Sequence, residues 1–203
     1  MNASHMIVRL NRVDLLTLSG VISSSLAVLS GLHGQVYLGI ALLFLAMLGD
    51  ALDGILARKF GLERAFGRYL DGFMDVLIYL VSPALLFWQL GFDGAYGMLL
   101  MLMLICGCVR LSVFNGIGNI QESDGLAYLG MPVFWSVFLL AGYAALLLVV
   151  PQTLLNPLLA IALAAFAYAM LLRRPFFKFK SLKQILSITL GGSGLFLLLQ
   201  FGG

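Results

Sequence analysis

Charged residues are scarce in this chain. Asp, Glu, Lys and Arg make up only 10% of its 203 residues, whereas hydrophobic residues make up 62%. A soluble domain carries about a quarter of its residues as charges, so this composition cannot cover a water-exposed surface. The net charge of +3 gives no indication of nucleic acid as a partner. It indicates instead a membrane protein whose basic side meets anionic lipid.

Cysteine is also nearly absent. The chain has two, Cys106 and Cys108, both within an apolar run typical of a helix. Residues two apart point to different faces of a helix, which argues against a shared zinc ion or a disulfide. Both are therefore predicted to be buried apolar thiols.

Apolar runs of nearly 20 residues fill most of the chain, which predicts transmembrane helices rather than a barrel. The predicted fold class is all-α, a polytopic integral membrane helical bundle with six core transmembrane helices and a seventh at the C-terminal end. A short N-terminal interfacial helix over Ile7–Val13 is expected before them, because arginines lie among apolar residues there. The predicted spans are Leu15–Leu32, Gln35–Ala57, Tyr69–Leu90, Tyr96–Asn115, Tyr128–Val150, Leu158–Leu172 and Gln184–Phe201.

The opening Met1–Met6 resembles a cloning scar, and residues 7–203 are predicted to form a single membrane domain. Seven spans with the N-terminus inside place all 12 Lys and Arg on one side of the membrane. The positive-inside rule puts that side in the cytoplasm, and the predicted location is the inner membrane.

Four aspartates concentrate the acidic charge of a chain that has only nine acidic residues. Asp50 and Asp53 are three apart, and Asp71 and Asp75 are four apart, so each pair shares one face of a helix. A short basic turn between the two helices would bring all four together. An ionised side chain near the membrane centre costs about 2.5–3.5 kcal/mol, and mutual repulsion adds to that cost. Two divalent cations would offset both costs, and oxygen-only ligands suit Mg²⁺ or Mn²⁺.

The residues alone leave other interpretations open. The carboxylates could pair with basic neighbours, or they could line a cation transporter, since intramembrane charges often mark ion pathways. Spans four to six are almost purely apolar, however, and offer no polar path across the membrane. A two-metal site for phosphoryl transfer would need one carboxylate free to accept a proton, and the spacing does not say which. The basic neighbours are Arg58, Lys59, Arg64 and Arg68.

A resemblance to a known family rests on these residues. It is carried by Asp50-x2-Asp53-Gly54-x2-Ala57-Arg58-x8-Gly67-x3-Asp71-x3-Asp75. This pattern is similar to the motif of the CDP-alcohol phosphotransferase family at every defined position. The resemblance implies a membrane enzyme of phospholipid synthesis, which transfers a phosphatidyl group from CDP-diacylglycerol to a small polar alcohol and releases CMP.

The resemblance also implies roles for single residues. Asp50, Asp53 and Asp71 would bind the metals, and Asp75 would be the general base as well as a fourth metal candidate. The small residues of the motif would lie close to the nucleotide, and its arginine would lie near the nucleotide or the diphosphate. Family members are often homodimers, which implies a homodimer here. These substrate-binding candidates are Gly54, Ala57, Arg58 and Gly67.

The acceptor alcohol is suggested by a second stretch. Arg110-Leu-Ser-Val-Phe-Asn115, followed by Gly130-Met-Pro132, is similar to bacterial phosphatidylserine synthases within this family, which implies serine. Arg110 is a candidate to hold a phosphate or the acceptor's carboxylate, against the alternative of an interfacial arginine that reaches headgroups. Gly72 and Val113 depart from that subfamily, which usually has Ser and Arg there. Inositol phosphate, glycerol 3-phosphate or an amino alcohol are therefore alternative acceptors.

Overall fold

The computed structural model of the chain describes residues 7–118, 120–122, 125–176 and 181–202. The predicted cloning scar at Met1–Met6 lies outside the described residues. The elements in chain order are α1 (Arg12–Leu32), α2 (Val36–Phe60), α3 (Ala65–Asp75), the π-helix η1 (Val76–Val81), α4 (Ser82–Gln89), the 3₁₀ turn η2 (Gly94–Tyr96), α5 (Gly97–Ile117), β1 (Ile120–Glu122), β2 (Gly125–Leu129), α6 (Trp135–Leu146), α7 (Gln152–Leu171), β3 (Pro175–Phe176) and α8 (Leu182–Phe201).

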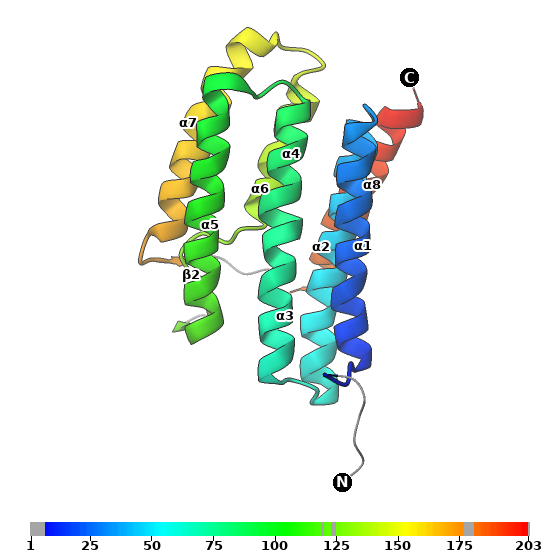
Figure 1. Cartoon of the computed structure of the whole chain (residues 1–203), viewed down its shortest axis with the longest axis vertical. Helices are drawn as coiled ribbons and strands as arrows, with labels where there is room; N and C mark the ends of the chain where they lie inside the picture. The colour runs from blue at the N-terminus through cyan, green and yellow to red at the C-terminus, as the bar shows by residue number, and fades with distance from the viewer. Residues whose placement is uncertain (1–6, 119, 123–124, 177–180, 203) are drawn as a thin grey trace.

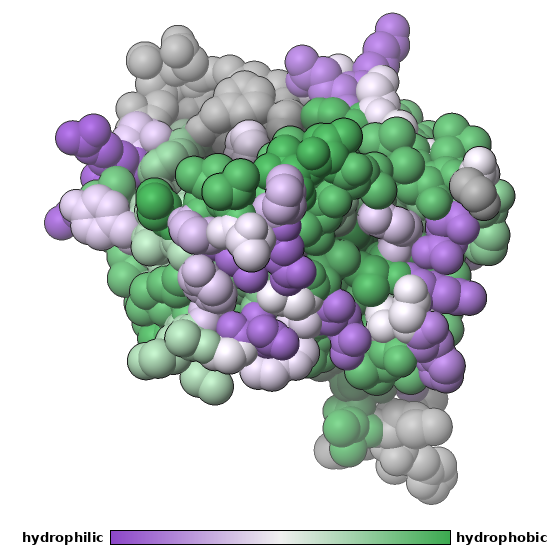
Figure 2. Space-filling model, turned by 90° about the horizontal axis from the view of Figure 1, so that it is seen from above, coloured by the Kyte–Doolittle hydropathy of each residue, from purple (hydrophilic) through white to green (hydrophobic). Residues whose placement is uncertain are grey.

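The helices stand side by side in an up-and-down bundle (Figure 1). α1 begins at the lower end of that view and α8 ends at the upper end. In the described part of the chain, six helices are long and apolar enough to cross a membrane. Seen along the bundle, hydrophobic residues cover much of the perimeter (Figure 2), as a lipid-facing surface requires. The predicted all-α polytopic membrane bundle is confirmed.

The seventh predicted span is present as α8, which lies along α2. Gly192 allows this approach, because a Cβ there would come within 2.8 Å of the Phe44 ring. At the far end of α8, the Gln200 side chain accepts a hydrogen bond from the amide of Leu38 at 3.2 Å. That bond satisfies one of the free amides in the first turn of α2.

The fifth predicted span, Tyr128–Val150, is wrong in its first part. Its helix, α6, begins only at Trp135, and Gly125–Leu129 forms the strand β2. Gly130 takes a left-handed conformation with φ 75°, and Pro132 has no amide hydrogen, so neither continues a helix. The resulting α6 is short, whereas α7 begins six residues before the predicted Leu158.

The predicted interfacial helix over Ile7–Val13 is also wrong, because residues 7–11 are not helical. The side chain of Asn11 accepts from the amides of Val13 and Asp14, and the Asp14 carboxylate accepts from the Asn11 amide. This capping box starts α1 at Arg12. Asp14, only 2% exposed, also forms an ion pair with Arg64, which ties the start of α1 to the start of α3.

Three short strands lie beside the lower part of α5 (Figure 1). β1 pairs antiparallel with β2, and β2 pairs antiparallel with β3, with Tyr128 opposite Phe176. The ring of Tyr128 lies 5.8 Å from that of Phe114 near the end of α5, so β2 is held against that helix. The hydrophobic core runs between the helices through residues such as Leu43, Ile78, Leu86, Leu140 and Leu163.

The two cysteines differ in environment. Cys106 is buried in the core, as predicted, but Cys108 is exposed. The two-residue separation places them on different faces of α5, so only one of them can face the other helices. The prediction of a buried thiol at Cys108 is therefore wrong.

Candidate active site

The helices α2 and α3 form a hairpin that is closed by residues 61–64 alone. Gly61 ends α2 in the left-handed conformation with φ 61°, and the amide of Leu62 donates to the Ala57 carbonyl at 2.9 Å. Glycine adopts this conformation without the penalty of a Cβ, so the chain reverses within one turn. The last turn of α2 carries Arg58 and Lys59, whose charges complement the negative end of the helix.

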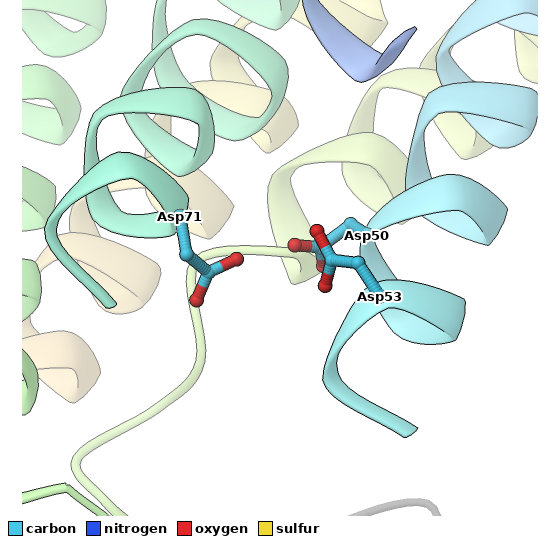
Figure 3. A group of neighbouring side chains, drawn as sticks. All are labelled: Asp50, Asp53 and Asp71. Carbon is cyan, nitrogen blue, oxygen red and sulfur yellow. The ribbon is translucent and has the colours of Figure 1, made fainter. Parts of the chain in front are cut away.

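The hairpin brings three carboxylates together (Figure 3). Asp50 and Asp53 project from α2 toward Asp71 on α3, and oxygens of the three lie within 4.8 Å of one another. Asp53 is 4% exposed, whereas Asp50 and Asp71 are half-buried. The cluster is therefore inside the bundle and still accessible from one side.

Asp75 lies one helical turn beyond Asp71 and is 8% exposed. Its Oδ1 is buried and has no hydrogen-bond partner. Among the residues that the structure describes, none of the four motif aspartates forms an ion pair with a basic side chain. Arg64, one of the basic neighbours, pairs with Asp14. The alternative in which basic neighbours simply neutralise these carboxylates is not supported.

Two hydroxyl groups contact the cluster. Thr17 on α1 donates to Oδ2 of Asp53, and Tyr79 in η1 donates to Oδ2 of Asp50 at 2.6 Å. Neither was predicted as a site residue. The sequence signal for Tyr79 is its position four residues after Asp75, which continues the polar stripe of the helix. No pattern along the chain links α1 to Asp53.

Arg110 reaches the same region from α5. It is 5% exposed, and its Nε and Nη2 atoms have no hydrogen-bond partner. The guanidinium carbon lies 5.0 Å from the centre of the Phe114 ring and 5.3 Å from that of Tyr128. A buried cation held by aromatic rings, with unused donors, has the properties of an anion-binding group.

A family model for CDP-alcohol phosphatidyltransferases matches residues 10–188, a stretch that includes all four aspartates and Arg110. The chain belongs to the CDP-alcohol phosphatidyltransferase family.

Several curated proteins are similar to this family member. It is 31% identical over 170 residues to the CDP-diacylglycerol–serine O-phosphatidyltransferase of Bacillus subtilis, which covers 82% of this chain and 89% of the relative. It is 34% identical over 124 residues to the archaetidylserine synthase of Methanothermobacter thermautotrophicus, covering 59% of this chain and 52% of the relative. It is 32% identical over 149 residues to the CDP-diacylglycerol–serine O-phosphatidyltransferase of Methanocaldococcus jannaschii, covering 73% of this chain and 66% of the relative. The alignment thus spans only about half of the archaetidylserine synthase.

CDP-alcohol phosphatidyltransferases use divalent cations, and the residues present fit such an ion. The three clustered carboxylates offer only oxygen atoms, which are the ligands that hard divalent cations prefer. Their mutual repulsion is not relieved by any ion pair among the described residues. Asp50, Asp53 and Asp71 could therefore hold such a cation.

The small residues of the family motif lie along the same hairpin. A Cβ at Gly54 would meet only the Arg58 guanidinium, at 3.6 Å, and a Cβ at Gly67 would meet Asp14 and Arg64 at 3.7 Å. These are ordinary contact distances, so packing within the protein requires glycine at neither position. Ala57 is half-buried on the same stretch of α2.

The structure explains Gly72, which replaces the serine usual in the phosphatidylserine synthases of this family. A Cβ at Gly72 would overlap the side-chain amide of Asn115, whose Cγ would be 2.9 Å away. The amide of Asn115 therefore fills the space beside α3 where a serine side chain would stand. Val113, the second departure, is exposed on α5, and nothing in the structure explains its identity.

Proposed function

We propose that this protein transfers a phosphatidyl group from CDP-diacylglycerol to a small polar alcohol, with serine as the first candidate, and releases CMP. This proposal is supported by the convergence of Asp50, Asp53 and Asp71 and by the nearby Asp75, whose buried Oδ1 has no hydrogen-bond partner. The names of the relatives from Bacillus subtilis and Methanothermobacter thermautotrophicus both contain serine, which favours that acceptor.

Asp75 acts as the general base in this proposal. Its Oδ1 accepts the proton of the acceptor hydroxyl, because that oxygen has no partner within the protein. The acceptor oxygen then bonds to the lipid-bearing phosphorus, while the bond from this phosphorus to the bridging oxygen breaks. CMP leaves with that oxygen. Arg110 binds either the carboxylate of the acceptor or a phosphate of the donor.

Two divalent cations, Mg²⁺ or Mn²⁺, are proposed to occupy the site, held by Asp50, Asp53 and Asp71, with Asp75 as a further ligand candidate. When bound, they would neutralise the diphosphate and stabilise the charge on the departing CMP. The protein residues orient the reactants: Thr17 and Tyr79 hold two of the ligating carboxylates by hydrogen bonds.

The site is proposed to face the cytoplasm from the inner membrane. Apart from Arg110, which lies within the second half of α5, the described Lys and Arg lie at or next to the start of α1, the end of α2, the start of α3, the end of α7 and the start of α8. These helix ends all lie in the lower half of the bundle in Figure 1. Asp50 and Asp71 lie in the same half of the bundle, and the positive-inside rule assigns that half to the cytoplasm. The homodimer that the family implies remains a prediction.

The proposal is tested by CMP release from purified protein supplied with CDP-diacylglycerol and Mn²⁺. Serine, glycerol 3-phosphate, inositol 1-phosphate, ethanolamine and choline are added separately, beside a reaction without acceptor. We expect release to depend on serine and to stop when EDTA removes the metal, because the clustered carboxylates then repel the diphosphate. Release with another alcohol would keep the chemistry and replace the acceptor. Folded protein that releases no CMP with any acceptor would contradict the proposal.

Gly54 provides a prediction in which stability and activity change in opposite directions. Gly54→Ala is expected to raise the unfolding free energy by about 0.5–1 kcal/mol, because alanine is the better helix former and space for its methyl group exists. The same methyl group is expected to lower CMP release about 10-fold, because it shifts the nucleotide that approaches this backbone. Thermal unfolding and CMP release measure the two effects.

Gly39 supplies the matched control. A Cβ at Gly39 would come within 2.8 Å of the Ala27 carbonyl oxygen, far along α2 from the aspartates. Gly39→Ala is therefore expected to destabilise the bundle by about 1–3 kcal/mol, while the folded protein keeps its specific activity. If Gly54→Ala destabilises the protein as Gly39→Ala does, the role of Gly54 is packing.

A further inference from the structure

Tyr79 contacts the aspartate cluster although it is no part of the family motif. It lies in η1, four residues after Asp75, and is 2% exposed. Its hydroxyl donates to Oδ2 of Asp50 at 2.6 Å, which joins η1 to α2. Asp50 in turn lies with Asp53 and Asp71 in the group of carboxylates within 4.8 Å. The Tyr79 hydroxyl is therefore bonded to one of the three carboxylates that could hold a cation.

The backbone around Tyr79 is shaped by Pro83. Proline has no amide hydrogen, and in an α-helix its ring clashes with the carbonyl four residues earlier, which here is that of Tyr79. The helix widens at this point into the π-helix η1, in which the amide of Ser82 donates to the Leu77 carbonyl five residues before it. The Tyr79 carbonyl thus loses its α-helical donor.

The replacement donor comes from another helix. Ser136 on α6, with 0% exposure, donates its hydroxyl to the Tyr79 carbonyl. Tyr79 is therefore fixed at both ends, by α6 at its backbone and by α2 at its hydroxyl. This arrangement links three helices to a single carboxylate, and each member of the link is buried or half-buried.

A hydrogen bond of this kind restricts the carboxylate. The terminal torsion of an aspartate is broad, so an unrestrained carboxylate samples many orientations. A donor on one oxygen selects one orientation and leaves the remaining lone pairs for a cation. Loss of a partner that orients a metal ligand typically costs about 10–100-fold in metal affinity or activity.

We propose that Tyr79 is a positioning residue, which orients Asp50 for divalent-cation binding and is itself held in place by Ser136. This inference rests on the proposed function, since it assigns Asp50 to the metal. It adds a determinant of metal affinity that comes from η1 and α6, outside the aspartate motif.

The test compares Mn²⁺ binding by purified wild-type protein, Tyr79→Phe and Ser136→Ala, measured by electron paramagnetic resonance of free Mn²⁺ without acceptor. Tyr143→Phe is the matched control, because Tyr143 is also buried and donates to Oδ1 of Asn156 at 2.6 Å, away from the aspartates. Tyr79→Phe is expected to bind Mn²⁺ about 10-fold more weakly. Ser136→Ala should change affinity in the same direction by less, and Tyr143→Phe should bind as the wild type does.

Two further readouts separate positioning from structure. Without metal, Tyr79→Phe and Tyr143→Phe should unfold at similar temperatures, because each loses one buried hydroxyl bond. Excess Mn²⁺ should restore CMP release by Tyr79→Phe. Wild-type affinity in Tyr79→Phe would overturn the inference and leave the proposed function standing, provided that the wild-type protein releases CMP. A folded wild-type protein that neither binds Mn²⁺ nor releases CMP would overturn both.

Discussion

Asp75→Asn is expected to lower CMP release by about 1,000-fold, because general-base catalysis contributes about 100- to 10,000-fold and asparagine cannot accept the proton. Binding of CDP-diacylglycerol in the presence of Mn²⁺ should persist. The buried Oδ1 of Asp75 has no hydrogen bond to lose, and Asp50, Asp53 and Asp71 all keep their carboxylates in this variant. Single-turnover CMP release and binding of labelled CDP-diacylglycerol measure the two effects.

Asp53→Asn is the control for this experiment. Asp53 lies in the carboxylate cluster, so its replacement should weaken Mn²⁺ binding itself and, through it, the binding of the donor. The two variants remove the same charge from neighbouring buried positions, and only their places in the site differ. Full activity in Asp75→Asn would exclude Asp75 as the base, and an unchanged Mn²⁺ titration in Asp53→Asn would exclude that residue as a ligand.

Arg110→Gln is the second change with a large expected effect. Removing one partner of a buried charged pair costs about 2–5 kcal/mol, so kcat/KM with serine is expected to fall about 100-fold. Stability should fall by no more than about 2 kcal/mol, because the variant loses the contacts of the guanidinium with the Phe114 and Tyr128 rings but no hydrogen bond of Nε or Nη2. The prediction is therefore a loss of activity without a loss of folding, measured by steady-state CMP release and thermal unfolding.

The choice of acceptor shows which anion Arg110 binds. Ethanolamine is serine without its carboxylate, so a guanidinium that binds this carboxylate does not increase activity with ethanolamine. If Arg110 binds the acceptor, the variant and the wild-type protein should use ethanolamine equally well. An equal loss with both acceptors would assign Arg110 to a donor phosphate instead. Arg173→Gln is the control, since Arg173 is exposed after α7. A loss of activity in Arg173→Gln as large as that in Arg110→Gln would indicate a general effect of removing positive charge.

The location of the aspartate cluster could be predicted from the sequence. Asp50 and Asp53 share a helix face by their spacing, as do Asp71 and Asp75, and the apolar runs on either side predict helices long enough to cross a membrane. A short turn between two such helices leaves only an antiparallel hairpin, so the carboxylates of α2 and α3 must meet near its closed end. Local periodicity and the lipid environment are sufficient for this much.

The shape of the fifth span could not be predicted from hydropathy alone. Apolar composition extends over Tyr128–Val150, but a helix does not run through Gly130 and Pro132, and α6 begins only at Trp135. The amide of Met131 instead donates to the Ala169 carbonyl of α7 at 3.0 Å. The backbone at this point is satisfied by a partner far along the chain, which a window of neighbouring residues does not include.

Spacing within one or two adjacent helices is sufficient to predict a helical membrane bundle, its basic end and the aspartates that meet there. The groups that surround the aspartates are known only from the packed helices. Thr17 reaches Asp53 from α1, Ser136 holds Tyr79 from α6, and Asn115 lies against Gly72 from α5. These contacts join residues far apart in the chain, so they depend on how the helices pack and are not encoded in any local period.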